Sequence, residues 1–202
     1  VISGRSQLLS MTLPANSKEA KAARTIYEQS HRLSDLITSL RMFAEPPKAD
    51  RKPTSVSMLL QNVIRKLRQN MTDVPSGCEI FLQLKKEIPP VLLDEQQIIQ
   101  AVLELMHNAL QASPRSMVQL SAVVTPEQEL MIQVIDDGVG MDEHTLAHAM
   151  DPFFSAKPAG RRVGMGLPRA QQLAAAHGGR IELRSQPPAG SVASLLIPLE
   201  SP

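Results

Sequence analysis

The stretch VIDDGVGMDEH, residues 134–144, decides the fold, because an apolar run stops there at two acidic residues and a glycine-rich loop follows. Asp136 ends the predicted strand, and Gly138 and Gly140 alternate with apolar residues after it. Glycine lets a backbone approach a planar ring closely, and a carboxylate can accept a hydrogen bond from an exocyclic amine. The stretch alone fits a surface turn and a nucleotide pocket equally well, so the flanking sequence must decide.

The composition predicts a globular protein in a reducing compartment. Hydrophobic residues make up 43% of the 202 residues and charged residues 20%, which is enough for a buried core. The formal net charge of +1 gives no argument for nucleic-acid binding by bulk electrostatics. The single cysteine, Cys78, excludes an intrachain disulfide. No apolar run approaches the ~18 residues of a membrane span. The chain begins without Met, in what reads as the middle of a helix, so we expect a piece of a longer protein.

Residues 1–46 predict a helical hairpin. Between residues 20 and 44, Ile26, Leu33 and Leu40 recur every seven residues, which is typical of a helix in a bundle. Pro14 lies in the segment that turns the chain between the two helices. Residues 47–54 are rich in proline and charge and predict a linker, so residues 55–202 form a second domain.

The second domain predicts an α+β fold. Helical patterns cover residues 55–71, 94–113 and 165–177, the second of them capped by Asp94. Alternating patterns predict strands at 78–84, 116–124, 129–136, 179–185 and 191–199. Helices on one face of a mixed, mainly antiparallel sheet make a two-layer sandwich.

A polar pair lies on the helix predicted for residues 94–113. Glu104 and Asn108 are four residues apart and share a helix face. For the pair alone, a solvent-exposed edge is the better interpretation. The alternative is a site, because the amide oxygen of Asn108 suits an Mg²⁺ ion held between phosphate oxygens.

The long irregular stretch before the third helix predicts a mobile lid. Adjacent aromatic residues and several cations suit a segment that closes over a triphosphate, although a loose surface loop has the same composition. These residues are Phe153, Phe154, Lys157, Arg161 and Arg162. Gly164 and Gly166 come directly before a helix, where backbone amides can bind phosphate.

Together, in this order, these pieces resemble one family. The N box, first glycine box, F box and second glycine box of sensor histidine kinases match ELMHNALQAS, DDGVG, DPFFSAK and GMGL. The resemblance covers residues 51–198 and implies the Bergerat ATP-binding sandwich of the GHKL proteins. The hairpin also resembles the dimerisation hairpin of these kinases, with the phosphoacceptor histidine upstream of Val1.

The resemblance implies roles for the site residues. Asp136 would read the adenine amino group, with Gly138 and Gly140 beside the base. Asn108 would hold Mg²⁺ against the phosphates of ATP, with Glu104 as a further metal or catalytic group and Lys157 as a catalytic cation. The remaining expected nucleotide contacts are Phe153, Phe154, Arg161, Arg162, Gly164, Gly166, Leu167 and Ser191.

The implied function is ATP-dependent phosphorylation of a histidine, for relay to an aspartate of a response-regulator receiver domain. We expect a homodimer through the hairpin, a cytoplasmic location, no nucleic-acid partner and no direct membrane contact, although an upstream sensor region could anchor the parent. Two alternatives stay open. The family usually carries Asn at position 104, so Glu104 could instead be the general base of a GHKL-type ATPase. A non-catalytic nucleotide-binding module is the other.

Three histidines could be taken for functional residues. His144 and His148 are four residues apart, as in a metal pair on a helix, but no third ligand is evident and solvated side chains are expected. His177 precedes Gly178 and predicts a residue at a helix end with a favourable interaction with the helix dipole.

Overall fold

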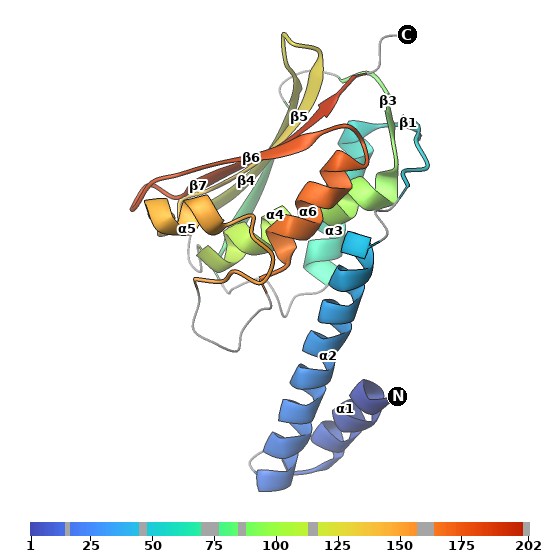
Figure 1. The fold of residues 1–202 in the computed structure, drawn as a ribbon, viewed down its shortest axis with the longest axis vertical. Helices are drawn as coiled ribbons and strands as arrows, with labels where there is room; N and C mark the ends of the chain where they lie inside the picture. The colour runs from blue at the N-terminus through green and yellow to red at the C-terminus, as the bar shows by residue number, and fades with distance from the viewer. Residues whose placement is uncertain are drawn as a thin grey trace.

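The computed structural model describes residues 1–14, 17–44, 48–69, 77–84, 88–112, 117–156 and 164–199. Within the second helix it describes no side chain at residues 31, 32, 35 and 38–44. The helical hairpin projects from one end of an α/β body (Figure 1). No helix in these ranges has the length and apolarity that a bilayer span requires.

The hairpin consists of α1 (Ile2–Thr12) and α2 (Lys18–Ala44). Small side chains line the contact between the helices, since Ser6, Ala20 and Ala23 are each 5% exposed or less. The predicted apolar seam faces away from this contact: Ile26 is 51% and Leu33 58% exposed. A single chain therefore leaves the seam without apolar cover at these positions.

The body is the predicted α+β sandwich. Its five strands run in the order β2-β4-β5-β7-β6, and only β2 and β4 pair in parallel. Burial alternates along β5, so the sheet has one covered face, against which the helices pack (Figure 1). The strands are β2 (Glu79–Leu84), β4 (Met117–Val124), β5 (Glu129–Asp136), β6 (Arg180–Ser185) and β7 (Ser191–Pro198). The helices of the body are α3 (Val56–Gln69), α4 (Glu95–Ala112), α5 (Glu143–His148) and α6 (Gly166–Ala175).

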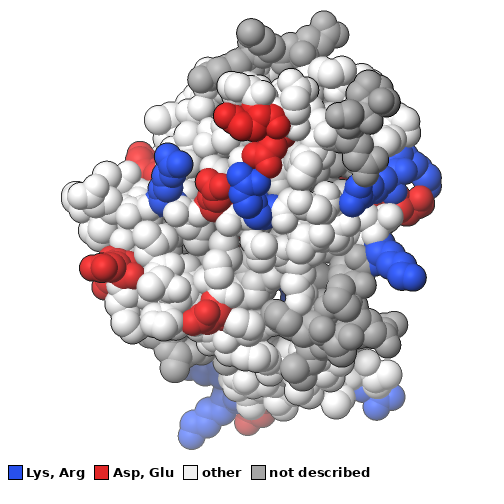
Figure 2. All heavy atoms as spheres, turned by 45° about the horizontal axis from the view of Figure 1, so that its top comes forward, with Lys and Arg blue, Asp and Glu red and all other residues white. Residues whose placement is uncertain are grey.

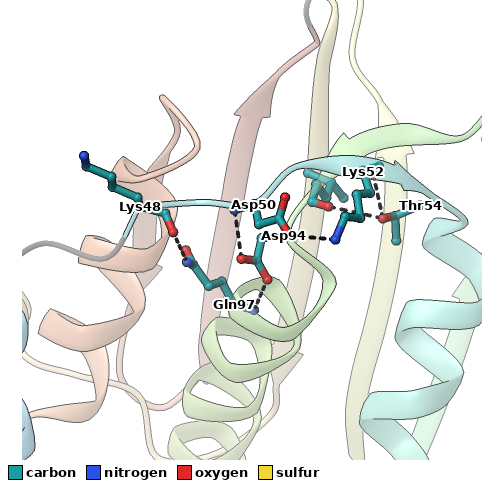
Figure 3. Close-up of polar contacts among 7 residues, drawn as sticks. Lys48, Asp50, Lys52, Thr54, Asp94 and Gln97 are labelled. Atoms are coloured by element: carbon teal, nitrogen blue, oxygen red, sulfur yellow. Dashed lines mark hydrogen bonds and ion pairs between the residues drawn. The ribbon is translucent and has the colours of Figure 1, made fainter.

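A small second sheet lies where a plain linker was expected. β1 (Lys52–Thr54) pairs antiparallel with β3 (Val91–Leu93). Figure 3 shows how polar contacts hold this connection to the start of α4: Asp94 accepts from the backbone N–H of Asp50 at 3.1 Å, and Gln97 donates to the carbonyl of Lys48 at 3.0 Å. The segment that follows the hairpin is therefore bound to the body.

The cap predicted for α4 is confirmed, because Asp94 Oδ1 accepts from the Gln97 backbone N–H at 3.1 Å. His177 lies at the end of α6 as predicted, where its ring bonds to one of the last carbonyls of the helix, but its contact with α4 was not predicted. His177 is 2% exposed, and its Nε2 accepts from the Asp94 backbone N–H at 3.1 Å. Its Nδ1 lies 2.9 Å from the Leu173 carbonyl, so the contacts place a proton on Nδ1. His177 thus joins the end of α6 to the start of α4.

Candidate functional site

Asp136 is the buried acid of the opening stretch. It is the last residue of β5 and is 5% exposed. Its Oδ1 accepts the backbone N–H of Gly138 at 3.0 Å, which holds the start of the loop under the end of the strand. Asp137 is exposed instead, and its Oδ1 accepts the backbone N–H of Met117 at 3.2 Å. The two neighbouring acids therefore differ in environment, and only Asp136 is enclosed.

Serine hydroxyls from the β6–β7 hairpin fix the far side of this loop. Ser191, which is 8% exposed, pairs with Asp136 across the sheet. Its hydroxyl lies 3.0 Å from that of Ser185, which also accepts the backbone N–H of Met141 at 2.7 Å. Sequence reasoning named Ser191 and missed Ser185. Only the pairing of β6 with β7 brings Ser185 to the loop, and no local signal announces it.

Gly140 is required by packing within the protein. Its φ is +70°, and a Cβ there would lie 2.8 Å from the carbonyl oxygen of Gln186 in the β6–β7 turn. The sequence-based reason for this glycine was approach to a planar ring. The structure supplies a different one: the loop lies directly against the turn.

Gly164 closes the other end of the described site. Its φ is +71°, and a Cβ there would lie 2.7 Å from the carbonyl carbon of Phe153. The Phe153 backbone N–H donates to the Gly164 carbonyl at 3.0 Å, and Phe153 itself has a φ of +69°. Left-handed backbone is strained for a phenylalanine, so this cross-link holds an unfavourable conformation at the base of the predicted lid.

The two aromatic residues of the F box have different environments. Phe153 is 50% exposed. Phe154 is half-buried and lies 5.6 Å from the ring of His148, centroid to centroid. His148 Nδ1 is 2.7 Å from Asp151 Oδ2. In the described parts of the chain, no group of three or more His, Cys, Asp and Glu side chains is placed to hold a metal. His144 and His148 are both exposed, which agrees with the solvated side chains that were expected.

The short helix α5 has a charged cap. Asp142 accepts the Thr145 backbone N–H at 2.7 Å. Hydrogen bonds from the side chain and then the backbone of Thr145 hold the pKa of Asp142 below its ordinary range. The cap stays ionised at neutral pH and fixes the direction in which the chain leaves the glycine loop.

Glu104 and Asn108 have different environments, although they share one face of α4. Glu104 is 8% exposed, and its Oε1 accepts from Arg169 Nη1 and from Gln100 Nε2, each at 2.9 Å. Asn108 is half-buried, one turn further along. The solvent-exposed edge is therefore wrong for Glu104, and sequence reasoning missed its partner Arg169.

The start of α6 faces Glu104. A Cβ on Gly166 would lie 3.1 Å from Glu104 Oε2, and the Met165 cap provides no side-chain hydrogen bond. The first amides of α6 therefore have no side-chain cap, which is the usual arrangement of an anion site. Leu167 is half-buried beside them. Lys157, Arg161 and Arg162 lie outside the described residues.

The donor set suits a nucleotide with its Mg²⁺. Mg²⁺ bound to phosphates needs only one or two protein ligands, and the Asn108 amide can supply one. Glu104 fits the metal poorly, because Oε1 already accepts from two N–H donors.

Charges of both signs are interspersed over the face in Figure 2, so that face shows no extended patch of one sign.

Comparison with protein families gives one match over most of the body. Residues 93–201 match the model of the histidine kinase-, DNA gyrase B- and HSP90-like ATPases. Among curated proteins, the alginate biosynthesis sensor protein KinB of Pseudomonas aeruginosa is 29% identical over 194 residues. That alignment covers 94% of this chain but 32% of KinB, so the chain spans about a third of this relative.

Solved histidine kinases share the fold. Full-length ShkA, crystallised with AMPPNP, superposes with a TM-score of 0.79 at 21% identity, over 100% of this chain and 43% of that one. Histidine kinase ThkA, crystallised with the response regulator TrrA, gives a TM-score of 0.74 at 16% identity, over 98% and 57%. At these identities the likeness establishes the architecture, and it includes the hairpin as well as the sandwich.

Proposed function

Because this chain belongs to the family of histidine kinase-, DNA gyrase B- and HSP90-like ATPases, we propose that it is the Mg-ATP-binding part of a sensor histidine kinase. In this proposal the γ-phosphoryl group of ATP passes to a histidine and then to an aspartate of a response regulator. The single observation that carries it is the enclosed Asp136 at the start of a glycine loop, in a fold whose α6 N-terminus has no side-chain cap.

Each described residue has a proposed part in holding the nucleotide. Asp136 accepts a hydrogen bond from the adenine amino group, and Gly138 lets the backbone pass beside the base. Asn108 holds Mg²⁺, which neutralises phosphate charge when bound. The first amides of α6, from Gly166, bind the phosphates through their N–H groups and the helix dipole. We also propose contacts from the lid residues Lys157, Arg161 and Arg162.

The proposal favours phosphotransfer over water activation. A general base must offer an available lone pair to the water that it deprotonates. Glu104 Oε1 is instead bound to the Arg169 guanidinium, and its Oε2 faces Gly166. This engagement of Oε1 supports an anchoring part for Glu104, and the variant Glu104→Gln distinguishes that part from a general base.

The proposed assembly follows the hairpin. Residues 1–46 are the dimerisation hairpin, 47–54 the connection and 55–202 the ATP-binding domain, and a second copy covers the exposed seam of Ile26 and Leu33. ThkA was crystallised with a response regulator, which supports a receiver domain as the partner of this chain.

The test is calorimetric titration of the chain with ADP and AMPPNP, each with and without Mg²⁺, beside Asn108→Ala. We expect saturable binding that Mg²⁺ strengthens in the wild type, and loss of that Mg²⁺ effect in the variant. Steady phosphate release should be negligible. The proposal fails if the folded wild type binds no adenine nucleotide, and rapid ATP hydrolysis that Glu104→Gln abolishes would establish the ATPase instead.

A further inference from the structure

The contact between Glu104 and Arg169 is the most enclosed of the ion pairs among the described residues. The side chains are 9% and 17% exposed, and the Nη1–Oε1 distance is 2.9 Å. An ion pair removed from water needs good geometry and further hydrogen bonds to offset the cost of desolvation. Gln100 provides one such bond to the same carboxylate oxygen at 2.9 Å. A built contact of this kind calls for a reason beyond chain stability, because apolar residues of similar volume stabilise a core equally well or better.

The position of the pair supplies that reason. Glu104 lies one helical turn before Asn108 on α4, and Arg169 lies in the first turn of α6, three residues after Gly166. α4 and α6 are antiparallel, since Asp94 at the start of α4 meets His177 at the end of α6. The ion pair therefore links α4 to α6 at one end of the two helices. In the proposed function, this is the end at which the Asn108 amide and the first backbone amides of α6 face the nucleotide.

The pair also sets how closely the helices approach. Oε2 of Glu104 would lie 3.1 Å from a Cβ on Gly166, so the carboxylate occupies the space beside that residue. Oε1 is held from α4 by Gln100 and from α6 by Arg169. The carboxylate is thus a fixed spacer, with its position determined from both helices.

We propose that Arg169 is a positioning residue: through Glu104 it fixes the first turn of α6, with its phosphate-facing amides, relative to Asn108. This inference rests on the proposed function. Arg169 touches neither metal nor base in this scheme, so it acts on the phosphate half of the site and leaves the adenine half, at Asp136, unchanged. A guanidinium suits the task because it donates from a rigid fork.

The experiment separates the two halves of the ligand. Affinities for Mg-ADP, by calorimetry, and for adenosine, by NMR titration, are measured for wild type, Arg169→Met and Arg169→Lys. Arg184→Met, which replaces an exposed arginine on β6, is the matched control. We expect Arg169→Met to weaken Mg-ADP binding at least about tenfold and to change adenosine affinity less than about twofold. Arg169→Lys should restore part of the loss, and Arg184→Met should match the wild type.

Three outcomes overturn the inference while the proposed function stands: unchanged Mg-ADP affinity in folded Arg169→Met, an equal loss of adenosine binding, or no partial recovery in Arg169→Lys. Failure of the wild type to bind either ligand would instead refute the proposed function. Arg169→Met leaves the buried Glu104 carboxylate without the guanidinium, and this could prevent the variant from folding. In that case the double variant Glu104→Met with Arg169→Met, which removes both charges, should fold. It should show the same selective loss, and wild-type Mg-ADP affinity in the double variant would overturn the inference.

Discussion

Replacing Asp136 by Asn tests the proposed adenine half of the site with almost no change in shape. Asp136 is 5% exposed, and its Oδ1 accepts the Gly138 N–H. An asparagine keeps that acceptor but turns the second oxygen into a donor, which would face the amino donor of adenine. A hydrogen bond to a charged group contributes about 1.5–3 kcal/mol. At ~1.4 kcal/mol per tenfold, we expect Mg-ADP affinity to fall by a factor of roughly 10–150.

The neighbouring acid supplies the control for this prediction. Asp137 is exposed, and an asparagine there can still accept the Met117 N–H. Asp137→Asn should therefore bind Mg-ADP within about twofold of the wild type, since its change lies in water. Calorimetric titration of both variants, after thermal melts that establish folding, gives the comparison. Equal affinity in both variants, or a larger loss in Asp137→Asn, would refute the assignment of the buried acid to adenine.

Three further predictions concern stability. Gly164→Ala should lower the free energy of unfolding by ~1–3 kcal/mol, because φ is +71° and backbone lies within 3 Å; an unchanged denaturation midpoint contradicts this. Asp94→Ala should lower the free energy of unfolding, measured by a urea melt, by about 1–2 kcal/mol, because the Gln97 N–H loses its cap. Asp94→Asn should keep most of that stability. Arg180 is hydrogen-bonded to Glu129 and lowers the pKa of the Glu129 carboxyl. The pair therefore stabilises the folded state fully above the ordinary carboxyl pKa of about 4.3, and this stability is lost as the pH falls through the lower pKa of the folded state. Glu129→Gln should therefore melt below the wild type at pH 7 and converge with it near pH 2, and a constant difference would exclude this linkage.

The parts of the fold that sequence predicted are those with local signals. The Asp94 cap precedes its helix directly, and the alternating strands of the β4–β5 and β6–β7 hairpins carry their turns between them. β1 and β3 were not predicted from the sequence. Each has only three residues, and each forms a strand only by pairing with the other, which lies far along the chain. A proline-rich segment predicts a linker as long as the strand that pairs with it is not known.

The candidate site divides in the same way. Glycine and acid at the end of a strand are contiguous, so Asp136, Gly138 and Gly140 could be picked out from a single stretch. The environment of Glu104 could not, because Arg169 comes from another helix and carries no signal of its own. The acceptor role of His177 Nε2 likewise follows from a backbone N–H at the start of α4. The ion-pair partner of Glu104 and the hydrogen-bond partners of His177 depend on contacts made in the folded structure, and no local sequence pattern predicts them.

The pairing of β5 with β7 has a consequence for the order in which this chain folds. The hairpins β4–β5 and β6–β7 close over short turns, but Asp136 meets Ser191 only when the two hairpins join across the middle of the sheet. Contacts between distant residues form late, because the intervening chain must first be ordered. The proposed adenine site is therefore not formed until the two hairpins have joined. We expect a bound nucleotide to slow unfolding without accelerating refolding, so that its effect on the chain is kinetic protection of the native state.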